Sequence, residues 1–173
     1  MQNAWSWAEP EAEVIGHLRD EMRDSIPSEW VEETDPHISI LPGFEVPQDN
    51  MDNLISELED AQSELVGGVI EVTGFHCYNP IEADSPTFVV GLDVEIDLET
   101  IRNEQKNAVE QVGGSLLYEP VNAHITLFKE GDGGDDNDGL TTEQATTVDS
   151  RLNELSEDAQ FETTIQSVSI ERF

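Results

Sequence analysis

The sequence places a histidine, a hydroxyl and aliphatic residues at the same spacing in two short segments. Residues 37–40 read His-Ile-Ser-Ile and residues 124–127 read His-Ile-Thr-Leu. In a β-strand successive side chains point to opposite faces, so each segment would present one imidazole beside one hydroxyl. Imidazoles titrate near neutral pH, and two of them can remove one proton and deliver another in the same reaction.

One copy of this pattern is weak support for catalysis, because serine and threonine are common and a half-buried histidine in a strand is often merely hydrogen-bonded. The two copies lie 87 positions apart (124 minus 37), about half the chain, and both have aliphatic flanks. The pair predicts two similar halves that face each other across a cleft, with His37, Ser39, His124 and Thr126 as candidate site residues.

Four segments show the periodicity or capping signals of helices. The first follows Pro10, and the second follows Pro47 with apolar residues at positions 51, 54, 55 and 58. The third follows Asp97, a good helix cap, and the fourth begins at a capping-box pattern of Thr141 and Gln144. Two glycine pairs are expected to terminate the second and third helical segments, namely Gly67-Gly68 and Gly113-Gly114.

The strands are expected between these helices. The segments are 37–41, ended by a Pro42-Gly43 turn; 69–73, 75–78 and 87–94 as an antiparallel meander around an 80–86 turn; a strand pair at 116–118 and 124–128; and a terminal strand at 161–170. The segment from Trp5 to Trp7 is assigned no element, and the glycine-rich segment 131–139 reads as a loop. This order predicts an α+β fold rather than a regular βαβ alternation.

The paired motifs, their separation and the terminal strand resemble the two-histidine (2H) phosphoesterases, especially the 2′-5′ RNA ligase and RNA 2′,3′-cyclic phosphodiesterase family. The similarity in element order covers nearly the whole chain, although the two motifs alone are specific. The second motif of that family commonly ends in arginine, where this chain has Lys129, and the first motif usually has threonine, where it has Ser39. Lys129 keeps a cation at its position, and Ser39 keeps a hydroxyl at its position.

The resemblance implies a bilobal fold, in which two pseudo-symmetric lobes of antiparallel sheet and helices surround a central cleft. It implies hydrolysis of a 2′,3′-cyclic phosphate on an RNA end or a small cyclic nucleotide, with His124 as base and His37 as the acid that protonates the 3′ oxygen. Ser39, Thr126 and Lys129 would bind the phosphate, and neither a metal nor another cofactor is required. Ligation to a 2′-5′ bond, another cyclic phosphodiester substrate, or a non-catalytic module that binds an RNA end or a protein remain alternatives.

The charge of the chain is far outside ordinary usage. Its 39 acidic and 7 basic residues give a formal net charge of −32, while 36% hydrophobic residues in 173 suffice for one compact domain over 1–173. A disordered acidic protein and a folded protein adapted to high salt both fit this charge, and the apolar periodicity favours the folded, halophilic protein.

The single Cys77 excludes an internal disulfide and zinc sites that need paired cysteines. No basic leader and no stretch of ~20 apolar residues occurs, so we expect a cytoplasmic protein without a membrane partner. We also expect the protein to be a monomer. His76 and Cys77 would face opposite sides of a strand, and His17 would lie on the polar side of the first helix. A calcium loop aligned on Gly139 lacks its essential carboxylates, and no phosphate-binding glycine pattern is present.

Overall fold

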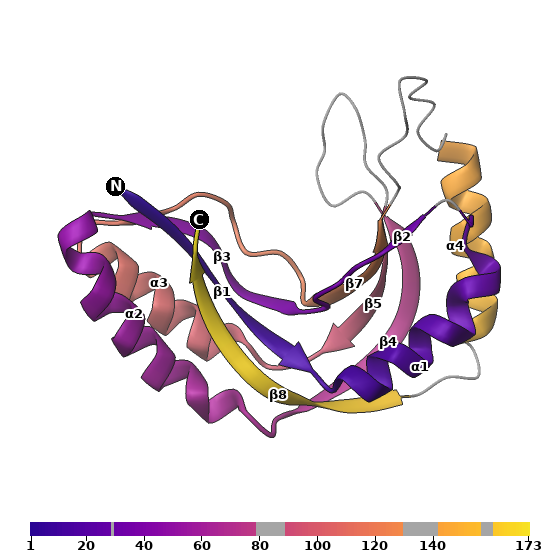
Figure 1. Cartoon of the computed structure of the whole chain (residues 1–173), viewed down its shortest axis with the longest axis horizontal. Coiled ribbons are helices and arrows are strands. Elements are labelled where there is room, and N and C mark those ends of the chain that lie inside the picture. The colour runs from indigo at the N-terminus through magenta and orange to yellow at the C-terminus, as the bar shows by residue number, and fades with distance from the viewer. Residues whose placement is uncertain (29, 79–88, 130–141, 157–160) are drawn as a thin grey trace.

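The computed structural model describes residues 1–28, 30–78, 89–129, 142–156 and 161–173. In these ranges an antiparallel sheet curves strongly, with helices packed against it (Figure 1). The helices are α1 (Ala12–Met22), α2 (Gln48–Gln62), α3 (Glu99–Gln111) and α4 (Thr142–Ser156). The strands are β1 (Gln2–Pro10), β2 (Val31–Glu32), β3 (Ile38–Val46), β4 (Val69–Tyr78), β5 (Val89–Glu95), β6 (Ser115–Leu116), β7 (His124–Lys129) and β8 (Phe161–Arg172). The predicted α+β fold is confirmed.

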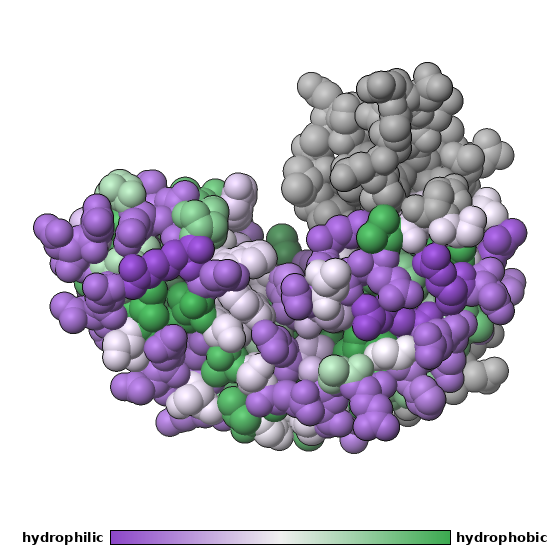
Figure 2. All heavy atoms as spheres, viewed as in Figure 1, coloured by the Kyte–Doolittle hydropathy of each residue, from purple (hydrophilic) through white to green (hydrophobic). Residues whose placement is uncertain are grey.

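The sheet has the strand order β2-β7-β5-β4-β8-β1-β3-β6. The long strand β8 belongs to both halves of the sheet, because β8 pairs with β4 through its first half and with β1 through its second half. Figure 2 shows that the surface is hollowed between the two halves, and that hydrophilic residues dominate the visible face.

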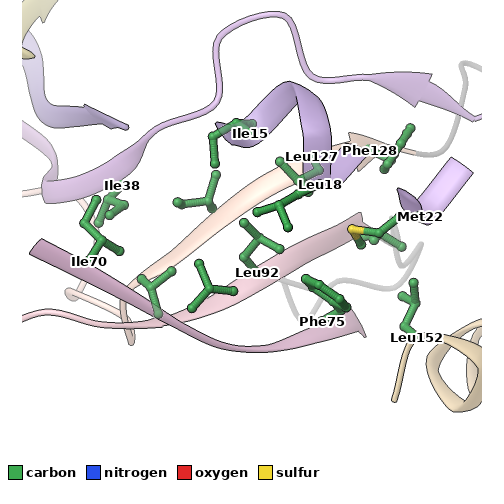
Figure 3. Close-up of a cluster of buried hydrophobic side chains, with 14 of the residues drawn as sticks. Ile15, Leu18, Met22, Ile38, Ile70, Phe75, Leu92, Leu127, Phe128 and Leu152 are labelled. Carbon is green, nitrogen blue, oxygen red and sulfur yellow. The ribbon is translucent and has the colours of Figure 1, made fainter. Parts of the chain in front are cut away.

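Two hydrophobic clusters hold the fold together. The larger one joins α1 and α4 to β4, β5 and β7, with Leu18, Leu92, Phe128 and Leu152 among its fully buried members (Figure 3). The smaller cluster packs Met51, Leu54 and Leu58 of α2 and Val109 of α3 against β1 and β3. The predicted apolar stripe of the second helix is therefore the face that covers the β1–β3 end of the sheet.

Several predicted strand boundaries are wrong. Pro42 and Gly43 do not end a strand, because β3 runs through them to Val46 with an irregular register opposite β1. Segments 69–73 and 75–78 form one strand with an irregularity at Thr73. The expected strand pair does not form, since β6 pairs with β3 at one edge of the sheet while β7 pairs with β5 and β2 near the other.

The helix ends follow the predicted signals closely. Asp97 lies one residue before the N-cap of α3, and its carboxylate accepts a hydrogen bond from the Glu99 amide at 3.2 Å. Gly67 and Gly113 have φ values of 84° and 81°, which glycine adopts without the steric cost of a Cβ. The capping-box residue Thr141 and the predicted loops 80–86 and 131–139 lie outside the described residues. Among the described residues, no helix is long and apolar enough to cross a membrane.

Candidate active site

The two motifs lie at the starts of β3 and β7. These strands are far apart in the order of the sheet, yet they contact each other, because the curved sheet brings their starts together (Figure 1). His37 immediately precedes β3, and His124 is the first residue of β7. The fold therefore brings the two motif strands together, as the sequence predicts.

The aliphatic residues of both motifs pack into the same core. Ile38, Ile40, Ile125 and Leu127 are fully buried members of the larger hydrophobic cluster. Alternation along each strand then directs the intervening histidines and hydroxyls to the opposite face, and all four of these residues are half-buried. We call this the polar face of the motif strands.

The two histidines have the same local hydrogen bond. Nδ1 of His37 lies 2.8 Å from the carbonyl oxygen of Asp35, and Nδ1 of His124 lies 2.8 Å from the carbonyl oxygen of Asn122. A carbonyl oxygen can only accept, so Nδ1 donates in both rings, and proton exchange with a substrate falls to Nε2. Both imidazoles are thus oriented for the same kind of chemistry by the residue two positions earlier.

Each motif strand is irregular directly after its hydroxyl residue. The register of β3 shifts between Ser39 and Leu41, and that of β7 shifts between Thr126 and Phe128, so each strand has one extra residue there. In β7 the bulge directs Phe128 into the core opposite Val90. The next side chain, Lys129, therefore returns to the polar face with Thr126.

Arg102 of α3 holds the bulge of β3. Its Nε donates to the carbonyl oxygen of Ile40 and its Nη2 to that of Ser39, both at 2.8 Å. The amide of Leu41 donates to Oγ of Ser6 at 3.1 Å. Its two hydrogen bonds satisfy consecutive backbone carbonyls at the bulge. Burial lowers the pKa of the Arg102 guanidinium below its ordinary value.

Replacing Arg102 by methionine is expected to lower the free energy of unfolding by about 3 kcal/mol, because two hydrogen bonds from a charged donor are lost. Denaturant unfolding in molar KCl measures this change. Lys106→Met is the matched control, since Lys106 is a half-exposed cation of the same helix whose ammonium lies 4.0 Å from Glu110. Equal losses in the two variants would contradict the role of Arg102 at the bulge.

Aromatic rings of β1 surround His37. The centroid of Trp5 lies 5.3 Å from that of His37 in an edge arrangement, and the centroid of Trp7 lies 6.2 Å away. Phe173 packs on Trp5 with centroids 6.3 Å apart. These aromatic residues were not predicted as part of the site, although two tryptophans separated by one residue already place two large rings on one face of a strand.

A hollow of about 970 Å³ lies beside the motifs rather than at the histidines. It borders Arg102 and Asn122, which hold the first and second motif respectively, but neither His37 nor His124 lines it. Five carboxylates line this hollow: Glu71, Asp93, Glu95, Asp97 and Glu99. Such a negative lining disfavours a phosphate, and one of these carboxylates, Asp93, lies directly opposite His124 in the β5–β7 ladder. We therefore place the candidate active site on the part of the polar face that carries the two motifs, next to the hollow rather than inside it.

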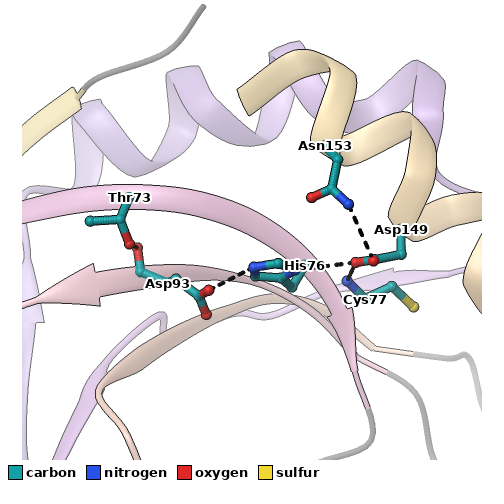
Figure 4. Close-up of polar contacts among 6 residues, drawn as sticks. All are labelled: Thr73, His76, Cys77, Asp93, Asp149 and Asn153. Atoms are coloured by element: carbon teal, nitrogen blue, oxygen red, sulfur yellow. Dashed lines mark hydrogen bonds and ion pairs between the residues drawn. The ribbon is translucent and has the colours of Figure 1, made fainter. Parts of the chain in front are cut away.

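Of the other two histidines, only His17 lies apart from this pair. His76 of β4 is near the second motif, because its ladder partner Gly91 lies opposite Thr126 and its ion-pair partner Asp93 lies opposite His124. His17 is exposed on α1, as predicted. Figure 4 shows His76 between two carboxylates, with Nε2 at 2.7 Å from Asp93 and Nδ1 at 3.3 Å from Asp149. The Cys77 amide also donates to Asp149, at 2.9 Å. His76 thus links β4 to β5 and α4. Within the described ranges, no group of three or more His, Cys, Asp or Glu side chains could hold a metal ion.

The candidate cation Lys129 is ion-paired. Its ammonium contacts the carboxylate of Glu33, a side chain that is 12% exposed. Arg172, the last residue of β8, pairs with Asp52 of α2. The structure thus places Lys129 on the polar face of the second motif, while Arg102 lies behind the first motif and Arg172 on the α2 side.

Comparisons with known proteins identify similar structures. No protein-family model and no curated protein matches the sequence. TT0787 of Thermus thermophilus matches with a TM-score of 0.63 at 15% identity, covering 98% of this chain and 87% of that one. Kluyveromyces marxianus Usb1 matches with 0.56 at 12%, covering 97% and 96%, and the MHV ns2 PDE domain with 0.55 at 11%, covering 100% and 99%. These likenesses show a shared fold, and they confirm the fold predicted from the two motifs.

Proposed function

We propose that this chain, which has the 2H phosphoesterase-like fold, hydrolyses 2′,3′-cyclic phosphates on RNA ends or small nucleotides to 2′-phosphates. The observation that carries the proposal is the matched setting of His37 and His124, each with Nδ1 held by a carbonyl two residues earlier, on strands that contact each other. The matched bulges also support a single domain built from two pseudo-symmetric lobes.

The proposed reaction moves one proton at each side of phosphorus. Nε2 of His124 removes a proton from water as the water oxygen bonds to phosphorus. Nε2 of His37 delivers a proton to the ribose 3′ oxygen as the bond between that oxygen and phosphorus breaks. Hydroxyls of Ser39 and Thr126, with the ammonium of Lys129, stabilise the negative charge on the non-bridging oxygens. The resemblance of the motifs supplies the order of base and acid.

The similar structures favour a nucleotide substrate. Usb1 of Kluyveromyces marxianus has also been solved with uridine monophosphate, and that structure matches with a TM-score of 0.54 at 13% identity over 99% of this chain and 97% of that one. The ns2 domain is called a PDE domain. At molar salt the screening length falls to about 3 Å, so a chain of net charge −32 can still hold a phosphate through local groups. Few contacts to a long RNA strand are then expected, which favours RNA ends and small nucleotides as substrates.

The rings beside His37 offer a place for the nucleobase. Trp5 is half-buried, so part of its ring is accessible next to a catalytic imidazole. Replacing Trp5 by alanine is expected to raise KM for 2′,3′-cyclic UMP about tenfold, since stacking contributes roughly 1–3 kcal/mol per base, with little change in kcat. Initial-rate kinetics check this, and Trp5→Phe, which keeps a ring, should stay near the parent. A fall in kcat at constant KM would contradict a base-binding role.

The test of the proposal is a substrate panel in molar KCl with EDTA. Hydrolysis of 2′,3′-cyclic UMP and of an RNA with a cyclic phosphate end is expected, while 3′,5′-cyclic UMP serves as the control with the other ring geometry. Adding an RNA with a 5′-hydroxyl end tests ligation, in which that hydroxyl would take the place of water as the nucleophile and His124 and His37 would keep their roles as base and acid. If the folded protein leaves every substrate unchanged but retains RNA ends, the binding-module alternative replaces the proposal.

A further inference from the structure

Glu33 connects the second motif to the chain that leads into the first. Its amide donates to the carbonyl oxygen of Leu127, the bulged residue of β7, at 2.7 Å. Its carbonyl oxygen accepts a hydrogen bond from Nη1 of Arg19 at 2.8 Å. Its carboxylate pairs with Lys129, and His37 follows four residues later. The backbone of Glu33 is thus fixed on both sides.

The side chain of Glu33 shares a face with Lys129. Val31 pairs directly with Lys129 in the β2–β7 ladder, and Glu33, two residues later, points to the same side as Val31. The same side of β7 carries Thr126, because the bulge returns Lys129 to it. A mostly buried carboxylate, 12% exposed, therefore lies where the proposed reaction needs to hold a phosphate.

The pairing changes what Lys129 offers to an anion. An ammonium has three N–H donors, so pairing with one carboxylate leaves donors for a phosphate oxygen. The pairing also fixes the direction of the Lys129 side chain. The same carboxylate cancels the lysine charge, and the pair as a whole is neutral. Lys129 is 51% exposed and its long side chain is flexible, so its position depends on the fixed Glu33.

We propose that Glu33 lowers the affinity of the site for phosphate by pairing with Lys129 and neutralising its charge. This inference rests on the proposed function in taking Lys129 as a phosphate ligand. Glu33 keeps phosphate binding weak, so that a 2′-phosphate product leaves readily, and substrate affinity then depends on the whole nucleotide rather than on charge.

The test measures binding of inorganic phosphate to Glu33→Gln, which removes the charge and keeps the shape and the backbone bonds. Titration calorimetry in the lowest KCl that preserves the parent circular dichroism spectrum should show about fivefold tighter binding than the parent, the scale of a partly exposed ion pair. The gain should shrink at 3 M KCl as screening increases. Glu33→Ala should change the affinity in the same direction.

Glu32→Gln is the matched control, because Glu32 is the exposed neighbour in β2 and its loss changes the net charge equally. It should bind phosphate like the parent, and Glu33→Gln should give no gain when combined with Lys129→Gln. Equal affinity of parent and Glu33→Gln, a gain that persists without Lys129, or no phosphate binding by any variant would overturn the inference. Turnover of 2′,3′-cyclic UMP is measured separately, and its absence would instead remove the proposed function.

Discussion

Replacing either His37 or His124 by alanine is expected to lower kcat for 2′,3′-cyclic UMP by about a thousandfold, since a positioned acid or base contributes 10²–10⁴-fold. In the proposed reaction, each variant removes one of the two Nε2 atoms that exchange protons with the reacting oxygens. Both imidazoles are half-buried at strand starts, so the fold should tolerate alanine. Initial rates in molar KCl with EDTA, beside circular dichroism spectra, give the comparison.

His17→Ala is the control for this experiment, because His17 is exposed on α1 and belongs to neither motif. It should keep the parent rate. The double variant should be little slower than the slower single variant, because the acid and the base act in one step and their losses do not add. A parent-like rate in either single variant would exclude that histidine from the chemistry.

Transfer from 3 M to 0.1 M KCl is expected to unfold the protein, a loss of at least about 5 kcal/mol of stability. The 39 acidic residues repel one another when salt no longer screens them. Few cations are placed to offset them: Arg19, Arg23 and Arg102 donate to backbone carbonyls. Circular dichroism and tryptophan fluorescence across a KCl series would follow the transition.

A sucrose control shows whether KCl stabilises the fold by screening charge or by being excluded from the protein surface, as many solutes are. Sucrose strengthens burial by being excluded from the protein surface, but it does not screen charge. At equal osmolality, KCl should therefore restore the folded spectrum and sucrose should not. A protein that melts at the same temperature in dilute buffer and in 3 M KCl would show that the acidic surface carries no such dependence.

The helices and the motif strands were predictable because their signals are local. In α2 the spacing of Met51, Leu54 and Leu58 gives the buried face without knowledge of its partner. The motif strands alternate regularly up to their hydroxyl residues. The polar face of His37 and His124 therefore follows from alternation together with the burial of the intervening isoleucines.

The remaining features depend on tertiary structure. In β1 the large Trp5 and Trp7 alternate with small Ala4, Ser6 and Ala8, an alternation of size rather than of polarity. Regular alternation from Thr126 would place Lys129 toward the core, and the bulge at Leu127 reverses this. Glu33 has no sequence signal for its contact with Lys129, because the two are joined by pairing across distant segments.

Phosphorus NMR of 2′,3′-cyclic UMP with the purified protein in molar KCl and EDTA tests the two-histidine account most directly. The account predicts that the cyclic phosphate resonance is replaced by that of uridine 2′-monophosphate with the parent, and persists with the His37→Ala/His124→Ala double variant. An unchanged substrate in the presence of folded parent, or parent-like conversion by the double variant, would contradict it.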